Sequence, residues 1–275
     1  FSYYGFEDFE LAYRLKRKGI FIELIKAKIF HKDFRNFKVW LLKFYYLGKF
    51  GITDIRKINI GIPSKGRLKD ESIKLFSEKS LNIQNSNSRN YFFNFEENEN
   101  FDGIFLHARE IIERLNDGTL DVGISGLDLL MELPDEYQKN IKIFKKLNFG
   151  HADLVVAVPN DWLDVQNMAD LEEVSFEFKD KYNRRMRVAT KYPKLTEDFF
   201  LSRGVTEFKI VGSLGATESY PFTGSAELIT DITSTGSTLK ENNLGVVSDG
   251  KILKSSACLL MSKKYNGEEF ETLIS

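Results

Sequence analysis

The sequence contains a single cysteine, and this scarcity excludes two kinds of protein. Cys258 is the one cysteine among 275 residues, so the chain cannot form an internal disulfide. No second cysteine and no histidine stands near it at the spacing of metal ligands, which excludes a cysteine-based zinc site. The chain is therefore neither a disulfide-stabilised scaffold nor a zinc-finger protein.

Long apolar runs and an excess of charge of one sign are also missing. No stretch approaches the roughly 18 apolar residues of a membrane-spanning helix, and 39 Lys and Arg balance 40 Asp and Glu. We therefore expect no membrane association and no nucleic-acid partner. The sequence begins with Phe1 and its first methionine is Met131, so we expect the natural N-terminus to lie upstream, and the missing signal peptide does not locate the protein.

The length predicts about two domains. The aromatic content and the pattern of apolar residues both change near residue 56. Residues 1–55 are rich in aromatic side chains and suggest helices over 6–18 and 39–50 with short strands within 21–29. From residue 57 onward, apolar strand patterns alternate with helical ones, which predicts an α/β fold with largely parallel sheets. The expected helices cover 68–79 and 108–115, and the expected strands are 58–62, 120–124, 141–147, 154–158, 187–189, 208–211 and 227–231. Residues 82–103, rich in Asn and Glu, predict an exposed loop or hairpin.

The segment after residue 230 carries the strongest chemical signal. An apolar strand ends at Asp231, and six small residues follow at 233–238. They are Thr233, Ser234, Thr235, Gly236, Ser237 and Thr238, and all except Gly236 carry a hydroxyl group. Hydroxyls and backbone N–H groups at a strand-to-helix turn, at the positive end of a helix dipole, are suited to bind a phosphate. Asp231 is placed to accept hydrogen bonds from a ribose or to help hold a cation. A Ser/Thr helix cap is the alternative, although a cap needs only one such residue.

Two further turns follow predicted strands. Lys65 and Arg67 stand at a helix N-terminus against the preference of the dipole, which indicates either an anionic ligand between them or a solvated basic turn. Gly123 and Gly126 follow another strand and permit close approach of a ligand to the backbone, a weak signal by itself.

These turns belong to a series of six motifs in the order of a known family. The motifs are Ser64-Lys65-Gly66-Arg67-Leu68, Asp121-Val122-Gly123-Ile124-Ser125-Gly126-Leu127-Asp128-Leu129, Phe149-Gly150-His151-Ala152-Asp153, Val188-Ala189-Thr190-Lys191-Tyr192, Ser213-Leu214-Gly215-Ala216-Thr217-Glu218 and Asp231-Ile232-Thr233-Ser234-Thr235-Gly236-Ser237-Thr238-Leu239. Together they resemble the short form of the ATP phosphoribosyltransferase of histidine biosynthesis, over about residues 57–264.

The resemblance implies a reaction and a fold. In this family N1 of ATP attacks the anomeric carbon of phosphoribosyl pyrophosphate and displaces pyrophosphate, with Mg²⁺ present, in the cytoplasm. The fold it implies is a two-lobed α/β arrangement like that of periplasmic binding proteins, with the active site in the interlobe cleft. Residues 56–275 would form this catalytic region, with lobe one at about 57–157 and 250–275 and lobe two at about 158–249. A regulatory subunit resembling histidyl-tRNA synthetase and an oligomeric assembly are also implied.

The resemblance also assigns roles to residues. The phosphoribosyl group would be held by Asp231, Thr233, Ser234, Thr235, Gly236, Ser237 and Thr238. ATP and pyrophosphate would be bound by Lys65, Arg67, Ser125, Gly126, Asp128, Lys191, Tyr192 and Glu218. No general base and no metal ligand are assigned, because a substitution through an oxocarbenium-like state depends on positioning and charge stabilisation.

The chain departs from the family pattern at a few positions. Thr230 stands where an apolar residue is usual, Glu227 replaces an aspartate, and the insertion at 94–102 is unusually rich in Asn and acidic residues. None of these touches the phosphate loop.

Residues 1–55 resemble something else, namely the acceptor-side end of a GT-A type glycosyltransferase. The resemblance assigns a base to Asp8 and metal binding to His31; a solvated Glu7-Asp8 pair and a surface histidine are the alternatives. The nucleotide-sugar half of such an enzyme would precede Phe1, so we expect residues 1–55 to add no activity.

Two other functions remain open at this stage. One is a non-enzymatic ligand-binding protein with the same two-lobed fold, and the other is a glycosyltransferase remnant fused to a passenger. The hydroxyl-rich loop argues against the first, and the missing donor domain argues against the second.

Overall fold

The computed structural model describes residues 57–84, 91–96, 98–265 and 270. The chain divides into two units, Phe1–Ile55 and Arg56–Ser275, and all described residues belong to the second. The elements expected within 6–50, together with Asp8 and His31, lie outside the described residues.

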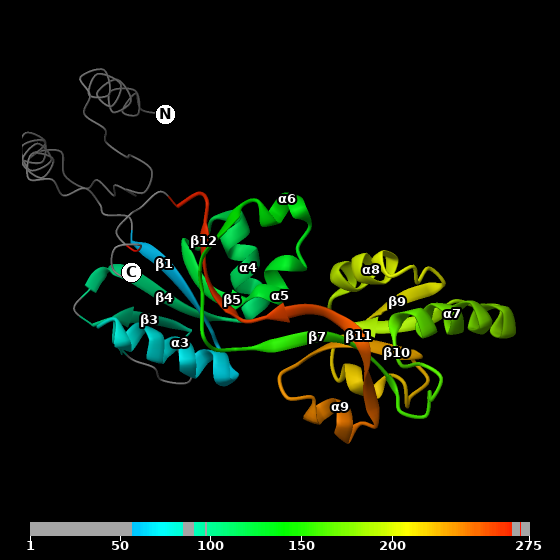
Figure 1. The fold of residues 1–275 in the computed structure, drawn as a ribbon. Helices are drawn as coiled ribbons and strands as arrows, with labels where there is room; N and C mark the ends of the chain where they lie inside the picture. The colour runs from blue at the N-terminus through cyan, green and yellow to red at the C-terminus, as the bar shows by residue number, and fades with distance from the viewer. Residues whose placement is uncertain (1–56, 85–90, 97, 266–269, 271–275) are drawn as a thin grey trace, which may run out of the picture. The chain divides into compact units, whose positions relative to one another are not determined.

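Two β-sheets organise the described part of the chain, one at the centre of each lobe (Figure 1). The first sheet has the order β2-β3-β4-β1-β5-β12-β6. Its strands are β1 (Ile58–Pro63), β2 (Ile83–Gln84), β3 (Phe92–Phe95), β4 (Asn98–Leu106), β5 (Val122–Gly126), β6 (Ile141–Lys146) and β12 (Ala257–Ser262). The second sheet has the order β11-β7-β10-β8-β9. Its strands are β7 (Ala152–Pro159), β8 (Met186–Thr190), β9 (Phe208–Gly212), β10 (Leu228–Thr233) and β11 (Leu244–Ser255). The expected two-lobed α/β fold is confirmed.

The central strands of each sheet run parallel, and this direction places the functional turns. In the first sheet β1 pairs in parallel with β4 and β5, and in the second β8 pairs in parallel with β10 and β9. The remaining pairs, such as β12 with β5 and β7 with β10, are antiparallel, so both sheets are mixed and the expectation of largely parallel sheets is wrong. Since carboxyl ends of parallel strands meet at one sheet edge, the turns after β1, β4 and β5 gather in one lobe, and those after β8, β9 and β10 gather in the other.

The strands β1, β5 and β12 of the first lobe are buried on both faces, which explains their continuous apolar runs. Along β12, Leu259 and Met261 pack in the cluster around Phe76, whereas Cys258 and Leu260 pack on the opposite face with Ile111. This period of two follows from the alternation of side chains along a strand. Burial also raises the pKa of the Cys258 thiol, so this cysteine serves as an apolar core residue.

Helices cover the sheets, and where the sequence predicts them they form. The helices of the first lobe are α3 (Gly66–Glu78), α4 (Ala108–Asp117), α5 (Leu127–Met131) and α6 (Asp135–Gln138). Those of the second are α7 (Met168–Tyr182), α8 (Pro193–Ser202), the 3-10 turn η2 (Thr217–Ser219) and α9 (Ser237–Glu241). None of the helices in the described ranges is long and apolar enough to cross a membrane.

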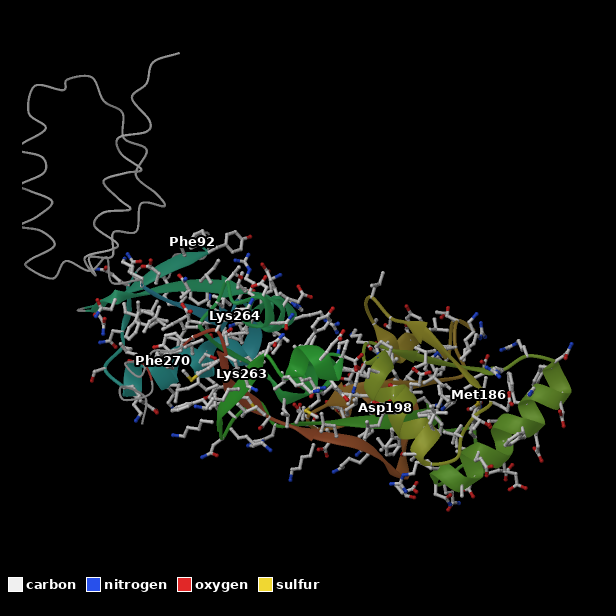
Figure 2. The ribbon with its side chains drawn as sticks, turned by 90° about the horizontal axis from the view of Figure 1, so that it is seen from above. Phe92, Met186, Asp198, Lys263, Lys264 and Phe270 are labelled. Carbon is white, nitrogen blue, oxygen red and sulfur yellow. The ribbon has the colours of Figure 1, made fainter. Side chains whose placement is uncertain are left out.

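Within 82–103, β3 and β4 form the expected hairpin pair, but the expectation that this segment is exposed is wrong for Phe93 and Phe95. β3 pairs with β4, which itself pairs in parallel with β1. Phe93 and Phe95 are buried, and the Phe95 ring lies 5.6 Å from that of Phe76. Phe92, by contrast, is exposed and projects from the lobe (Figure 2). The exposed residues of β3 alternate with the buried ones, so the polar residues mark only the outer face of this strand pair. Its inner face completes the core.

The chain passes between the lobes twice, and the two crossings lie side by side. β7 enters the second sheet, β11 leaves it, and their ends pair at Ala152 and Ser255. The Ala257 amide also donates to the Phe149 carbonyl at 3.0 Å. The second sheet therefore includes residues from Ala152 to Ser255, since β7 and β11 pair with each other from Pro159 with Leu244 to Ala152 with Ser255. The lobe bounds expected from the sequence, 158–249, stay a prediction.

Candidate active site

The hydroxyl-rich loop after β10 folds around a left-handed glycine. Gly236 has φ +74°, a conformation that favours glycine, and its amide donates to Thr233 Oγ1 at 2.8 Å. The hydroxyls of Thr235 and Ser237 are hydrogen-bonded to each other at 2.9 Å. The exposed residues of the loop are Ser234, Thr235, Ser237 and Thr238. The N-cap of α9 is Gly236, which has no side chain, and the hydroxyls of Thr233 and Thr235 accept from the amides of Gly236 and Ser237 at 2.8 and 3.4 Å. Two of the five hydroxyls therefore bind amides at the start of the helix.

Asp231, at the end of β10, lies in an acidic and partly buried environment. Burial raises the pKa of its carboxyl, and the negative charge of Glu218 raises it further; the Ile232 amide, which donates to Asp231 at 2.9 Å, and the charge of Lys191 act in the opposite direction. Three predicted site residues from three different turns are thus close enough to interact electrostatically. A pair of carboxylates in such surroundings favours a ligand that donates hydrogen bonds or carries positive charge.

The basic turn of the first lobe is exposed. Lys65 is the N-cap residue of α3, Gly66 follows it with φ +70°, and Lys65 and Arg67 both face solvent. Within the described ranges no ion pair involves either side chain. Two cations at a helix N-terminus without an acidic partner remain suited to a polyanionic ligand.

Asp128 and Tyr192 connect the two lobes directly. The Tyr192 hydroxyl donates to Asp128 Oδ2 at 2.7 Å, and the Ser255 hydroxyl donates to Asp128 Oδ1 at 2.6 Å. All three residues are buried. Burial, followed by the charge and the hydrogen bond of Asp128, raises the pKa of Tyr192, so the phenol stays protonated and acts as a donor.

Ser125 and Gly126, predicted to line the nucleotide side, are placed at the end of β5. Ser125 is fully buried and donates to the Ala108 carbonyl at 2.8 Å, which ties β5 to the first turn of α4. A Cβ at Gly126 would collide with the Asp128 carboxylate. Gly126 therefore leaves room for the Asp128 carboxylate, whereas Ser125 fixes the end of β5 to α4.

The two unusual residues of β10 have structural partners. Thr230 is fully buried and its hydroxyl is 2.6 Å from those of Thr190 and Thr196, so a small hydroxyl network replaces an apolar contact. Burial opposes the charge of Glu227, but hydrogen bonds from Arg187 and Arg184 outweigh that effect and lower its pKa to about 2.

The family resemblance implies a magnesium ion, and the described residues show which side chains could bind it. No group of three or more His, Cys, Asp or Glu side chains among them is arranged to hold an ion. Magnesium, however, commonly binds through one or two carboxylates with the remaining ligands from substrate phosphates and water. Asp231 and Glu218 supply that smaller donor set, so the site fits a magnesium ion that arrives with its substrate.

Known proteins are similar in sequence to this chain over most of its length. A family profile described as ATP phosphoribosyltransferase matches residues 107–275. The ATP phosphoribosyltransferase of Chelativorans sp. (strain BNC1) is 45% identical over 220 residues, which cover 79% of this chain and 96% of that protein. The enzyme of the same name from Rhizobium etli (strain CIAT 652) is 47% identical over 209 residues, covering 75% and 90%.

This chain belongs to the ATP phosphoribosyltransferase family. As a member of the family it is a transferase of histidine biosynthesis, and the binding-protein and glycosyltransferase-remnant alternatives are not favoured. Among solved structures, the ATP phosphoribosyl transferase (HisG:HisZ) complex from Thermotoga maritima has the same fold, with a TM-score of 0.60 and 22% identity over 78% of this chain and 93% of that one.

Two residues of this phosphoribosyltransferase that lie at the junction of the lobes, Arg109 and Glu132, belong to none of the sequence motifs. Arg109 Nη2 donates to the Lys191 carbonyl at 3.2 Å. Arg109 is a cation in the first turn of α4, against the preference of the helix dipole, and this pattern, which also marks Lys65 and Arg67, could have identified it. Glu132, after α5, accepts hydrogen bonds from the amides of Lys194 and Leu195 at 2.9 and 3.1 Å. Burial raises the pKa of Glu132 against these two hydrogen bonds. No local pattern marks Glu132, because its partners lie 62 and 63 residues away.

Proposed function

We propose that this chain transfers the 5-phosphoribosyl group of phosphoribosyl pyrophosphate to N1 of ATP and releases pyrophosphate. The observation that carries this proposal is the exposed row of hydroxyls at 233–238, which follows Asp231 at the carboxyl end of β10. In this proposal the hydroxyls and the amides of the turn bind the 5′-phosphate, and Asp231 accepts hydrogen bonds from the ribose hydroxyls.

Charge stabilisation would come from both lobes. As the bond from N1 to the anomeric carbon forms and the bond to pyrophosphate breaks, negative charge accumulates on the leaving group. Lys65, Arg67 and Lys191 would stabilise that charge, and Glu218 with Asp231 would favour the positive charge that develops on the ribose ring. This chemistry needs no strong base, so positioning accounts for the reaction.

Magnesium fits this scheme as a companion of phosphoribosyl pyrophosphate. Bound by the substrate's oxygens with Asp231 and Glu218, it would neutralise pyrophosphate as a leaving group. A cation at this place would offset the burial of the Asp231 carboxylate, which raises its pKa, and the smaller effect of the Glu218 charge.

We place ATP on the side of the first lobe. Asp128 and Tyr192 form a buried donor–acceptor pair suited to hydrogen-bond a nucleotide edge; Ser255 binds the Asp128 carboxylate and Gly126 leaves room for it. Buried polar groups of this kind discriminate between ligands because a wrong ligand leaves them unpaired.

The setting of the reaction is also part of the proposal. The Thermotoga maritima structure is titled as a HisG:HisZ complex, and we propose a regulatory subunit, one resembling histidyl-tRNA synthetase, for this chain as well. We further propose an oligomeric enzyme that acts in the cytoplasm.

Pyrophosphate release tests the reaction. The protein is mixed with ATP, phosphoribosyl pyrophosphate and magnesium, with the regulatory subunit added in a parallel sample, and pyrophosphate is followed by a coupled assay. Release that requires both substrates supports the proposal. Release from phosphoribosyl pyrophosphate alone indicates hydrolysis, and the absence of release in both samples contradicts the proposed reaction.

A further inference from the structure

The carboxylate of Glu132 joins the first lobe to the start of a helix in the second. Glu132 follows α5, and its two oxygens accept separate hydrogen bonds from the backbone amides of Lys194 (2.9 Å) and Leu195 (3.1 Å), both in the first turn of α8. The bonds span the lobes, since α5 packs beside the first sheet and α8 beside the second (Figure 1).

These bonds replace a cap that α8 lacks in its own sequence. Its N-cap residue is Tyr192, which makes no side-chain cap, and Pro193 at the first helical position has no N–H. Lys194 and Leu195 therefore carry the first free amides of the helix, the same groups that an N-cap side chain usually satisfies. A carboxylate is well suited to this place because the helix dipole is positive there.

The segment that Glu132 holds contains two predicted site residues. Lys191 and Tyr192 immediately precede α8, and the first lobe contacts both, through Arg109 at the Lys191 carbonyl and Asp128 at the Tyr192 hydroxyl. Lys194 adds a side-chain ion pair with Asp135 of the first lobe at 3.3 Å. Glu132 is distinct among these because its two oxygens accept from two backbone amides of α8 itself.

We propose that Glu132 is a positioning residue, which caps α8 from the opposite lobe and so keeps Lys191 and Tyr192 in the geometry that binds substrate. The proposal rests on the function proposed above for this site. Its consequence is that capping of α8 and approach of the lobes are one event: α8 is fully capped only when the lobes are together.

Loss of Glu132 should separate the lobes rather than unfold α8. The helix is anchored in the second lobe by buried Thr196 and Phe200. It also carries an internal ion pair between Lys194 and Asp198, the latter on the outer side of α8 (Figure 2). These contacts lie within the second lobe and remain when the interlobe bonds break.

The experiment compares Glu132→Ala and Glu132→Gln with the control Glu136→Ala, which removes an exposed carboxylate on nearby α6. All three are made in the full chain. Steady-state kinetics give kcat and the KM for each substrate. Spin labels at Glu113→Cys on α4 and Glu173→Cys on α7, both exposed positions, report the distance between the lobes by electron double resonance. The native Cys258 is buried.

We expect Glu132→Ala to raise the KM for ATP about fivefold to tenfold, the size of effect that loss of a helix cap produces. Its kcat should change by less than about twofold, and its label distances should broaden toward longer values. Glu132→Gln, whose amide oxygen still accepts one bond, should recover part of both effects, and Glu136→Ala should match the parent.

Parent-like KM values and label distances in Glu132→Ala would overturn the proposal. Equal loss of kcat and thermal stability in the Ala and Gln variants would overturn it as well, since that result indicates a purely structural role. If the parent itself lacks transferase activity, the proposed function fails, whereas the label distances still decide whether Glu132 links the lobes.

Discussion

The hydroxyl of Tyr192, in the second lobe, donates a 2.7 Å hydrogen bond to Oδ2 of Asp128, in the first. Asp128 has a second donor, Ser255, which lies where the chain returns from the second lobe to the first. One buried carboxylate thus contacts the other lobe and the crossing strand together.

The variant Tyr192→Phe should weaken this connection without altering packing. We expect a loss of about 1–2 kcal/mol in the free energy of unfolding, because one oxygen of a buried carboxylate loses its donor. The KM for ATP should rise. Urea unfolding of Tyr192→Phe, Asp128→Asn and the double variant measures the coupling, and strictly additive effects would contradict a direct interaction.

The phosphate loop is tested by Thr235→Leu. The larger side chain should block the turn and remove hydrogen bonds to phosphate, each of about 1.5–3 kcal/mol. We expect the KM for phosphoribosyl pyrophosphate to rise at least tenfold while the KM for ATP changes little. Thr206→Leu, at an exposed position in the same lobe, is the matched control. Unchanged kinetics in Thr235→Leu would remove the loop from the site.

The basic turn is tested by exchanging its two cations. If the planar guanidinium of Arg67 binds phosphate through two donors, Arg67→Lys should lower kcat/KM about tenfold or more. Lys65→Arg should be milder, since it keeps the charge and adds donors. Steady-state kinetics with varied phosphoribosyl pyrophosphate measure both. Should both enzymes behave like the parent, the turn is merely solvated.

The hydrogen bonds of Glu227 with Arg184 and Arg187 predict that the protein loses stability in acid. The folded-state pKa of Glu227 is about 2, below its usual 4.5. A lowered pKa contributes stability that is fully present above about pH 4.5 and is lost as pH falls toward about 2. Glu227→Gln should therefore be less stable than the parent at pH 7 by about 1–3 kcal/mol. The difference should shrink below pH 4.5. A difference that stays constant down to pH 2.5 would show that the arginines do not favour the charged form.

Removal of residues 1–55 should leave phosphoribosyl transfer intact. About a fifth of this chain lies outside the match to the Chelativorans enzyme, whose own length is covered to 96%. We expect kcat and both KM values of the 56–275 protein to agree with those of the full chain within about twofold. Loss of activity, or hydrolysis of nucleotide-sugars by the full chain, would contradict this division.

The sequence by itself determined the architecture and the family. Alternating strand and helix patterns predicted the α/β lobes, and the motifs from Ser64 to Leu239 identified the family in their correct order. Such features are local: the apolar period of a strand or the hydroxyls of one turn can be read without knowing what lies opposite them. The placement of Lys65 and Asp231 at the carboxyl ends of parallel strands follows from the same local logic.

Only the tertiary structure decided how the lobes meet. Glu132 looks like any surface carboxylate in the sequence, and it becomes a cap only because the fold brings it to amides 62 and 63 residues away. The same reason explains Phe93 and Phe95, which are buried in the core around Phe76 although their neighbours in the sequence are polar. It also explains Thr230, whose hydroxyl is satisfied by Thr190 and Thr196. Long-range hydrogen bonds and burial depend on which surfaces the fold brings together, and this information is not contained in any short window of the chain.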